Sequence, residues 1–353
     1  MSYVHPMMRP TRSSVLGLAW VALLAGCSSS GGEAPSDAAA DAPIAHPDGG
    51  HPLDTGTAPK HDAAKDTGHA TDTGAHDAGT KDTGHADSAA TPDASAPDAG
   101  PSCGGSGAWS LVWSDEFNGA DGSGIDTTKW AAQTGGSGWG NQEREYYTDD
   151  LANAQESGGN LVITATTAGA SAYSCWYGQC SYTSARLQTL GLFSQQYGRF
   201  EARLKIPSGQ GMWPAFWMLG NNIDTVNWPT CGEIDVMENI GKEPATVHGS
   251  MHGPSDAGAT NVTAGLSLDG GAFSDDFHVF AIEWETNVVR FYVDDTLYET
   301  VTPASDPAGA TWVFDQPFFL LLNVAVGGSW PGDPDGTTVF PQTMLVDYVR
   351  VCQ

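Results

Sequence analysis

The chain reads W-P-T-C-G-E-I-D-V-M-E-N from Trp228 to Asn239. Three carboxylates fall within six of these residues, and apolar side chains stand between them. Alternation with a period of two predicts a β-strand that has one face against a core. Like charges a few ångströms apart raise one another's pKa, so an acidic face of this kind is costly. The pattern indicates either a solvated edge strand or a site that needs paired carboxylates.

The spacing of these carboxylates predicts an irregularity in the strand. In a regular strand Glu233 and Asp235 share one face, whereas Glu238 points into the core beneath it. A charged glutamate is unfavourable there, so we predict a β-bulge near Val236–Met237 that returns Glu238 to the acidic face. The two glutamates can then approach the roughly 5–5.5 Å that separates the carboxyl groups of retaining glycosidases. The flanking tryptophans favour a site over a solvated edge strand.

The rest of the chain from residue 108 onward has a sequence pattern typical of an all-β protein. Short apolar or alternating runs are bounded by Gly, Asp, Asn or Pro, and no stretch keeps a 3.6-residue period. The expected strands are Trp109–Trp113, Leu161–Thr166, Arg199–Ile206, Phe277–Trp284, Val288–Val293, Phe318–Val324 and Met344–Val351. They predict a single β-sandwich. Eleven tryptophans follow residue 108, which favours an aromatic groove that stacks on sugar rings.

The N-terminus predicts export. Arg9 and Arg12 precede an apolar run from Val15 to Ala25, which is too short to span a membrane and is typical of a signal peptide over residues 1–26. The ending Leu-Ala-Gly-Cys resembles a bacterial lipobox, which implies lipidation of Cys27. The serine that follows resembles a signal for sorting to the outer membrane, facing the periplasm or the cell surface. The alternative is an ordinary signal peptide and a secreted protein.

Residues 27–102 differ from both neighbouring segments. They contain few aromatic or large aliphatic side chains, and the unit Lys-Asp-Thr-Gly-His-Ala occurs at residues 65–70 and again at 81–86. Such a segment buries too little apolar surface to offset its ordering entropy, so we predict a disordered tether. Its six histidines suit a solvated spacer better than a metal-binding tract. Residues 103–353 are then the catalytic domain.

The charge of the chain limits its partners. The formal net charge is −28, and nine Lys and Arg stand against twenty-nine Asp and Glu from residue 101 onward. This excess of acid repels nucleic acid and anionic membrane surfaces. It also disfavours sulfated or uronic-acid polymers, so a neutral substrate is expected.

Five cysteines remain once Cys27 is set aside. An oxidising compartment predicts two disulfides and one free thiol. Cys175 and Cys180 can close a small loop, Cys103 and Cys352 can join the ends of the domain, and Cys231 is then a buried free thiol. The sequence alone leaves this connectivity open.

Residues 232–239 resemble the Glu-x-Asp-x-x-Glu signature of glycoside hydrolase family 16, in the bulged form of its laminarinase-like members. The resemblance extends over residues 108–353, in the order of the family's blocks. They read LVWSDEF, GWGNQEREYYT, YTSARLQT, YGRFEARLKIPSGQGMWPAFWML, FHVFAIEW, LLNVAVGGSWPGDPDG and FPQTMLVDYVRV. It implies a concanavalin A-like β-jelly-roll sandwich with an open concave substrate cleft.

The resemblance also implies roles for individual residues. Glu233 matches the nucleophile, Glu238 the acid/base and Asp235 the carboxylate that assists them. The matching substrate contacts are Trp213 and Trp217 for stacking, Asn141, Glu143 and Arg186 for sugar hydroxyls, His252 beside the acid/base, and Asn323 and Trp330 on the acceptor side. A structural histidine at 252 and a salt bridge at 186 are the alternatives.

The resemblance further implies one structural calcium ion, on the convex face. Its ligands would be the main-chain oxygens of Glu116 and Gly159 and the carboxylate of Asp347, and hard oxygen ligands suit Ca²⁺. No cofactor is expected for catalysis.

The expected function is a retaining endo-β-1,3-glucanase, laminarinase-like, acting on β-1,3-glucan or mixed β-1,3-1,4-glucan through a covalent glycosyl-enzyme intermediate. We expect a monomer whose partner is the β-glucan polysaccharide. The alternatives are a bulged-motif relative that cleaves a galactan such as agarose, and a non-catalytic glucan-binding surface lipoprotein.

Overall fold

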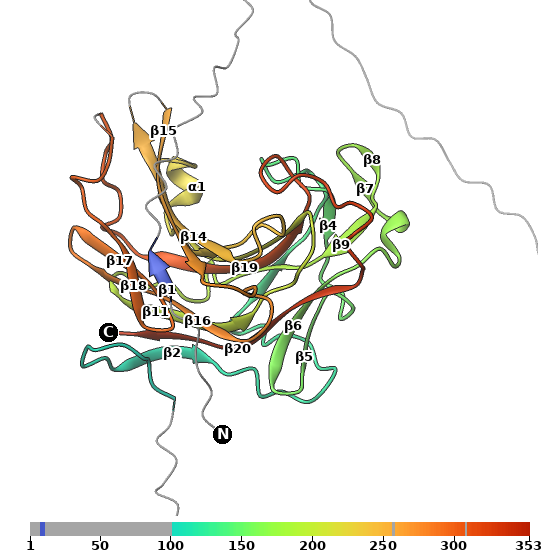
Figure 1. Ribbon diagram of the computed structural model, residues 1–353, viewed down its shortest axis with the longest axis horizontal. Helices are drawn as coiled ribbons and strands as arrows, with labels where there is room; N and C mark the ends of the chain where they lie inside the picture. The colour runs from blue at the N-terminus through green and yellow to red at the C-terminus, as the bar shows by residue number, and fades with distance from the viewer. Residues whose placement is uncertain (1–7, 11–100, 256–257, 308) are drawn as a thin grey trace, which may run out of the picture. The chain divides into compact units, whose positions relative to one another are not determined.

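The computed structural model describes residues 8–10 and 101–353, except 256–257 and 308 (Figure 1). The predicted signal peptide apart from residues 8–10, the lipidation site Cys27 and the tether up to residue 100 lie outside the described residues. The domain boundaries drawn from the sequence therefore stay predictions.

Two eight-stranded sheets form the two layers seen in Figure 1. The first, called sheet A, has the order β1-β15-β14-β13-β12-β19-β10-β3. Its strands are β1 (Met8–Pro10), β15 (Gly258–Leu268), β14 (Thr246–Ser255), β13 (Glu233–Glu238), β12 (Met212–Gly220), β19 (Phe318–Val326), β10 (Arg186–Gln188) and β3 (Ala131–Gln133).

The second layer, called sheet B, has the order β18-β17-β16-β11-β20-β6-β5, and β2 also pairs with β20. Its strands are β18 (Thr296–Val301), β17 (Val288–Val293), β16 (His278–Glu285), β11 (Gly198–Lys205), β20 (Gln342–Cys352), β6 (Asn160–Ala165), β5 (Ala154–Ser157) and β2 (Leu111–Asp115). Neighbouring strands in both sheets run antiparallel.

Shorter elements complete the described chain. The strands β4 (Glu145–Tyr147) and β9 (Tyr182–Ser184) pair in parallel, and β7 (Ser174–Cys175) and β8 (Gly178–Gln179) form a hairpin. The helices are the 3-10 turn η1 (Ala170–Ala172) and α1 (Ile223–Val226). In the part of the chain that the structure describes, neither helix has the length and apolar character needed to cross a bilayer.

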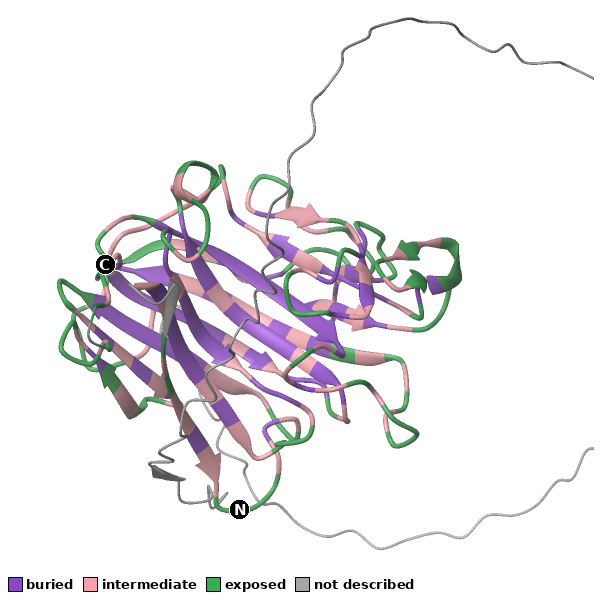
Figure 2. Cartoon of the chain, turned by 90° about the horizontal axis from the view of Figure 1, so that it is seen from above, coloured by how far each residue is buried: buried purple, intermediate pink, exposed green. Residues whose placement is uncertain are grey.

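The core lies between the two sheets because each strand turns alternate apolar residues inward. Strand β6 shows this plainly: Leu161, Ile163 and Ala165 are fully buried, and the residues between them are partly exposed. Figure 2 shows the same concentration of buried residues in the strands and of exposed residues in the loops. Strand β19 is buried throughout, because one face joins the main core and Phe319 and Leu321 join a second, smaller cluster on the other.

The sequence predictions for the fold are confirmed. Each of the seven expected runs forms a strand, with ends that differ by at most two residues. The predicted jelly-roll sandwich of antiparallel sheets is the observed architecture.

The cysteines pair as predicted. Cys103 is bonded to Cys352 and Cys175 to Cys180, whereas Cys231 is free and buried. The first disulfide joins the two ends of the described domain across 249 residues of sequence.

Candidate active site

The predicted bulge is present in β13. On the β12 side, Trp217 pairs with Asp235 and Phe216 pairs with Met237, so Val236 has no partner of its own. On the β14 side, the register also shifts by one residue between Asp235 and Glu238. A single extra residue in one strand of an antiparallel pair is a β-bulge.

The bulge sets the direction of Glu238. Val236 and Met237 are consecutive, yet both side chains lie in the main core and are at most 1% exposed. The alternation therefore restarts after Met237, and Glu238 is partly exposed instead of buried. Glu233, Asp235 and Glu238 consequently lie on one face of sheet A, turned away from the core. We call this surface the carboxylate face.

The side chains around Glu233 and Asp235 are in close contact. The two carboxyl groups share a hydrogen bond, which requires a proton between them. His252 Nε2 lies 3.1 Å from Asp235 Oδ2 and 4.0 Å from Glu233 Oε1. Within the described chain Asp235 Oδ2 accepts no hydrogen bond from an N–H or O–H group. The contact with His252 is therefore a short distance between polar atoms and does not have the geometry of a hydrogen bond.

Burial raises the pKa of all three carboxyl groups. The pKa of Glu233 rises to about 8 through burial and the charge of Asp235, although His252 and a hydrogen bond from Trp228 lower it. Burial, and then the charge of Asp235, raises the pKa of Glu238 well above its usual range. Carboxylates this close cannot all ionise together. The arrangement therefore favours a protonated Glu238 and one proton shared by Glu233 and Asp235.

The loop between β12 and β13 reaches the carboxylate face, where the ring of Trp228 lies 6.4 Å from the ring of His252. Helix α1 lies in this loop, and Ile223 and Val226 pack on the smaller apolar cluster that includes Cys231. The loop also carries Trp228, which is 49% exposed and donates a hydrogen bond to Glu233. An exposed indole thus reaches the carboxyl group proposed as the nucleophile.

Aromatic and polar side chains of β10, β12 and β19 lie next to the carboxylates. The Arg186 guanidinium lies between the rings of Trp139 and Trp217, 4.7 and 4.6 Å from their centroids. Its Nε donates to Gln133, and it forms no ion pair within the described residues, so the salt-bridge alternative is wrong. Trp217 Nε1 donates to Asn323 Oδ1 over 2.7 Å.

A second aromatic group surrounds Glu238. Trp213 Nε1 donates to Glu238 Oε1 over 2.9 Å, and its ring meets Trp330 edge-on at 5.4 Å. Trp330 also contacts His248, which is the β14 residue paired with Glu238. Burial lowers the pKa of His248, although Glu243 raises it.

The structure brings the predicted residues of the site together. All three carboxylates, His252 and the two β12 tryptophans lie on the carboxylate face, next to Arg186 and Asn323. Asn141 Nδ2 donates to Glu143 Oε1 over 3.3 Å, and the Asn141 carbonyl accepts from the Ser329 N–H beside Trp330. Glu143 is only 3% exposed, so its carboxylate is largely an internal acceptor.

Sequence reasoning missed four residues that contact this set, namely Trp139, Tyr147, Trp228 and His248. Trp228 was noted only as a neighbour of the acidic strand. The signal for Tyr147 was available, because Glu143, Glu145 and Tyr147 alternate in an extended segment and so share one face.

The residues predicted for calcium lie on sheet B. Strand β20 pairs Val346 with Leu161 of β6 and Val349 with Asp115 of β2. These registers bring the β5–β6 turn and the end of β2 to either side of Asp347, so the positions fit the expected ligands. The Asp347 carboxylate accepts from Arg203 Nη1 over 2.7 Å, a contact that an ion would have to share. The calcium site stays a prediction.

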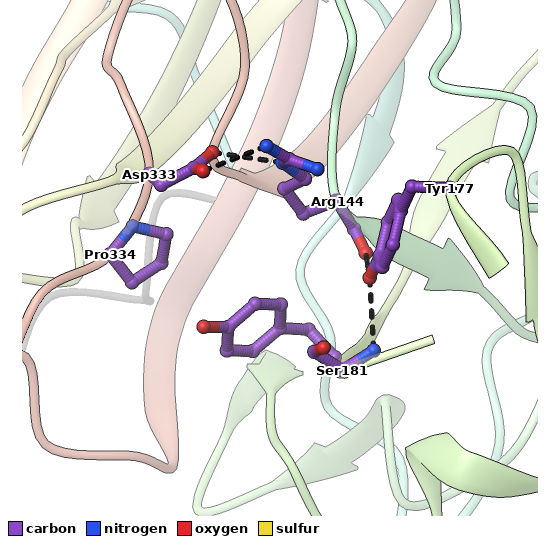
Figure 3. A pocket seen from close by; sticks show the side chains of 6 residues that line it. Arg144, Tyr177, Ser181, Asp333 and Pro334 are labelled. Atoms are coloured by element: carbon purple, nitrogen blue, oxygen red, sulfur yellow. Dashed lines mark hydrogen bonds and ion pairs between the residues drawn. The ribbon is translucent and has the colours of Figure 1, made fainter. Parts of the chain in front are cut away.

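A cavity of about 220 Å³ lies beside Arg144 (Figure 3). Arg144 forms two hydrogen bonds with Asp333, at 2.8 and 2.9 Å, and the Tyr177 hydroxyl donates to its carbonyl. Tyr177 belongs to the loop closed by the disulfide Cys175–Cys180. The cavity contains none of the predicted site residues, and we regard it as the place where this loop and the 327–338 segment are joined.

Paired carboxylates beside aromatic rings on an antiparallel β-sandwich are features of glycoside hydrolases. The chain belongs to the family described as "Glycosyl hydrolases family 16", whose sequence pattern matches residues 140–350. The comparisons agree with the resemblance drawn from the motif around Glu233. The chain is therefore a glycoside hydrolase.

Three similar proteins have related names. The "Beta-glucanase" of Rhodothermus marinus is 45% identical over 257 residues, which cover 69% of this chain and 85% of that protein. The structure of the laminarinase catalytic domain of Thermotoga maritima MSB8 shares 49% identity, with a TM-score of 0.63 over 69% of this chain and 98% of that one. The endo-β-1,3-glucanase of Pyrococcus furiosus shares 45% identity, with a TM-score of 0.63 over 69% and 94%.

Proposed function

We propose that the protein is a retaining endo-β-1,3-glucanase that hydrolyses β-1,3-glucan, or mixed β-1,3-1,4-glucan, at the carboxylate face. The observation that carries this proposal is the bulge in β13, because it places Glu238 on the same face as Glu233. The names of the similar proteins support β-1,3-glucan as the substrate.

The proposed reaction is a double displacement. Glu238, kept protonated by its raised pKa, donates a proton to the glycosidic oxygen while ionised Glu233 attacks the anomeric carbon. The bond to the leaving sugar breaks and a glycosyl ester forms on Glu233. Glu238 then takes a proton from water as the water oxygen attacks the same carbon. The ester bond to Glu233 breaks, which returns Glu233 to a carboxylate and releases a product of retained configuration.

Asp235 has an assisting role in this proposal. Its carboxyl shares a proton with Glu233 in the free enzyme, and its charge raises the pKa of Glu238. When substrate arrives, movement of that shared proton to Asp235 leaves Glu233 ionised for attack. Trp228, which donates to Glu233, stabilises the ionised form.

The sugar-binding residues are assigned by position. Trp217 is paired with Asp235 across β12 and β13, and Trp213 donates to Glu238, so both rings lie beside the carboxylates; aromatic faces stack on sugar rings. Arg186, Asn323 and His252 supply polar atoms next to these rings.

The test is product analysis on laminarin, lichenan, agarose and carrageenan, with Glu233→Gln as the inactive control. Reducing ends from laminarin, with the β-anomer formed first in the NMR spectrum, are the expected result. Activity on a galactan and none on laminarin would contradict the substrate assignment. Binding of laminarin without products would instead indicate a glucan-binding protein.

We also propose that the mature chain is anchored to the outer membrane through a lipid on Cys27. The lipobox-like sequence 24–27 supports this proposal. Cells grown with a labelled fatty acid should yield labelled wild type and unlabelled Cys27→Ser protein, and equal labelling of the two would contradict it.

A further inference from the structure

Three polar side chains share one buried face beside the proposed sugar site. Glu143, Glu145 and Tyr147 alternate along β4 and the residue pair before it, so their side chains point the same way. Their exposed fractions are 3%, 0% and 0%. Glu145 is the fully buried carboxyl group of the three side chains, and the proposed mechanism gives it no role.

The contacts of Glu145 require a proton. Its Oε2 accepts from the Val326 N–H over 2.6 Å. Its Oε1 is buried, and among the described residues no N–H or O–H group donates to it. The Glu145 carboxyl nevertheless forms a hydrogen bond with the carboxyl of Glu143. Two carboxylate oxygens are both acceptors, so a proton must lie between them.

The proton belongs on Glu145. Glu143 already accepts from the Tyr147 hydroxyl at 2.9 Å and from Asn141 Nδ2 at 3.3 Å, and an ionised carboxylate accepts both best. Glu145 receives one backbone N–H and is completely buried. An isolated buried charge is costly, so the neutral form is favoured there.

The hydrogen bonds continue from Glu143 to the carboxylate face. Tyr147, which donates to Glu143, accepts from Asn323 Nδ2 over 3.1 Å. Asn323 in turn accepts from the indole N–H of Trp217. Each group in this series of hydrogen bonds donates to the next, from Trp217 through Asn323 and Tyr147 to Glu143. The series is therefore complete only if Glu143 accepts the last hydrogen bond.

We propose that Glu145 acts as a neutral carboxylic acid that donates a hydrogen bond to Glu143 and, through Tyr147 and Asn323, fixes the orientation of Trp217. Glu145 is a positioning residue, since it contacts no substrate. The consequence for sugar binding, which follows from the orientation of Trp217, rests on the proposed function. The protonation of Glu145 does not rest on it.

The surrounding charges are consistent with this assignment. Burial, followed by the charge of Glu143, raises the pKa of Glu145 well above its usual range. The ionisable groups that face it are Glu143, Tyr147 and, beyond Tyr147, Arg186. Burial and the charges of both glutamates raise the pKa of Tyr147, which keeps its hydroxyl a donor.

The first test compares Glu145→Gln with Glu145→Leu. The glutamine amide can accept from Val326 and donate to Glu143, so kcat/KM on laminarin should stay within about threefold of wild type. The leucine variant cannot donate, and its KM should rise by roughly tenfold or more while kcat changes less. Glu156→Gln is the matched control, because Glu156 is a buried glutamate outside the site.

The second test measures oligosaccharide binding against pH in Glu233→Gln and in Glu233→Gln/Glu145→Gln. Loss of the Glu145 proton at alkaline pH should weaken binding in the first protein and not in the second. An infrared spectrum of otherwise wild-type protein should show a protonated carboxyl C=O stretch that disappears in Glu145→Gln.

Three outcomes would overturn the inference. They are a glutamine variant as impaired as the leucine variant, a leucine variant with unchanged KM, and an infrared difference spectrum between wild type and Glu145→Gln that lacks a protonated carboxyl band at neutral pH. The infrared result stands even if the leucine variant does not fold. If the wild type hydrolyses no β-glucan, the proposed function fails, and the infrared measurement still decides the protonation state.

Discussion

The two sheets each carry a group of acidic side chains, and only the group in sheet B has an arginine at its centre. Arg199, which is fully buried, lies 2.7 Å from Glu201, 3.3 Å from Glu283 and 2.8 Å from Asp295. The Gly104 N–H, next to the disulfide at Cys103, also donates to Glu201.

Among the described residues, the group in sheet A has no arginine or lysine at its centre. Glu233, Asp235 and Glu238 have His252 and indole N–H groups as their polar neighbours, and burial raises the pKa of each carboxyl. Removing one partner from a buried ion pair destabilises a fold strongly, whereas buried carboxyl groups without a cation shift their pKa values and become protonated. The difference indicates that the cluster in sheet B stabilises the fold. The cluster in sheet A lowers the stability of the fold, and its carboxyl groups stay available for proton transfer and attack.

The largest expected effect is on catalysis. Glu233→Gln should lower kcat on laminarin by about a thousandfold or more, because the nucleophile is lost. Glu238→Gln should cost about 10²–10⁴-fold, and less on an aryl glycoside whose leaving group needs no proton. Steady-state rates of the two variants and of Glu156→Gln check this. Near-normal activity in Glu233→Gln would remove the proposed distinction between the clusters.

The next effect is on stability. Arg199→Met should lower the free energy of unfolding by about 3–5 kcal/mol, since it leaves buried carboxylates without their cation. Urea unfolding measures this. The control is Arg290→Met, which removes an exposed ion pair with Glu285 and should cost about 1 kcal/mol or less. Equal losses in the two variants would show that the sheet B cluster is not the stabilising one.

A smaller effect should separate the clusters by pH. The pKa of Glu233 is raised in the folded chain from 4.5 to about 8, so its contribution to stability is present below pH 4.5 and is lost as pH rises through about 8. Glu233→Gln should therefore become more stable than wild type towards alkaline pH, by on the order of 1 kcal/mol. Glu201→Gln should instead be less stable. Thermal unfolding measured between about pH 4 and about pH 9 tests the sign of this pH dependence. A stability difference between Glu233→Gln and wild type that stays constant with pH would contradict it.

The smallest effect concerns the exposed member of the arginine cluster. Asp295 is 59% exposed, and solvent screens its attraction to Arg199. Asp295→Asn should change the unfolding free energy by less than about 1 kcal/mol. A loss as large as that of Arg199→Met would mean that Asp295, and not Glu201, determines the stability of the cluster.

Local pattern was enough to predict much of the fold. The alternation around Glu233 predicted both a strand and the bulge near Val236–Met237, because a charged Glu238 in the core would be too costly. Cysteine positions at the two ends of the domain and in one short segment predicted the observed disulfides, although the sequence left other pairings open.

Features that depend on long-range register were not predicted. The arginine cluster needs β11, β16 and the β17–β18 turn side by side, and no local pattern fixes that arrangement. The contact of Trp228 with Glu233 depends on the loop that carries α1. The protonation of Glu145 depends on its complete burial and on the N–H of Val326, a residue of β19 that only the tertiary fold brings to Glu145. Glu143, by contrast, is a local neighbour that alternation already places on the same face.

The most direct test of the account is azide rescue of Glu233→Ala on an aryl β-1,3-linked glucoside, with the glycosyl azide identified by NMR. Azide should enter the space left by the nucleophile and attack from that side in a single displacement, while Glu238 stays in place. The account predicts restored turnover and an α-glycosyl azide. A β-glycosyl azide, or no rescue with a folded variant, would contradict Glu233 as the nucleophile.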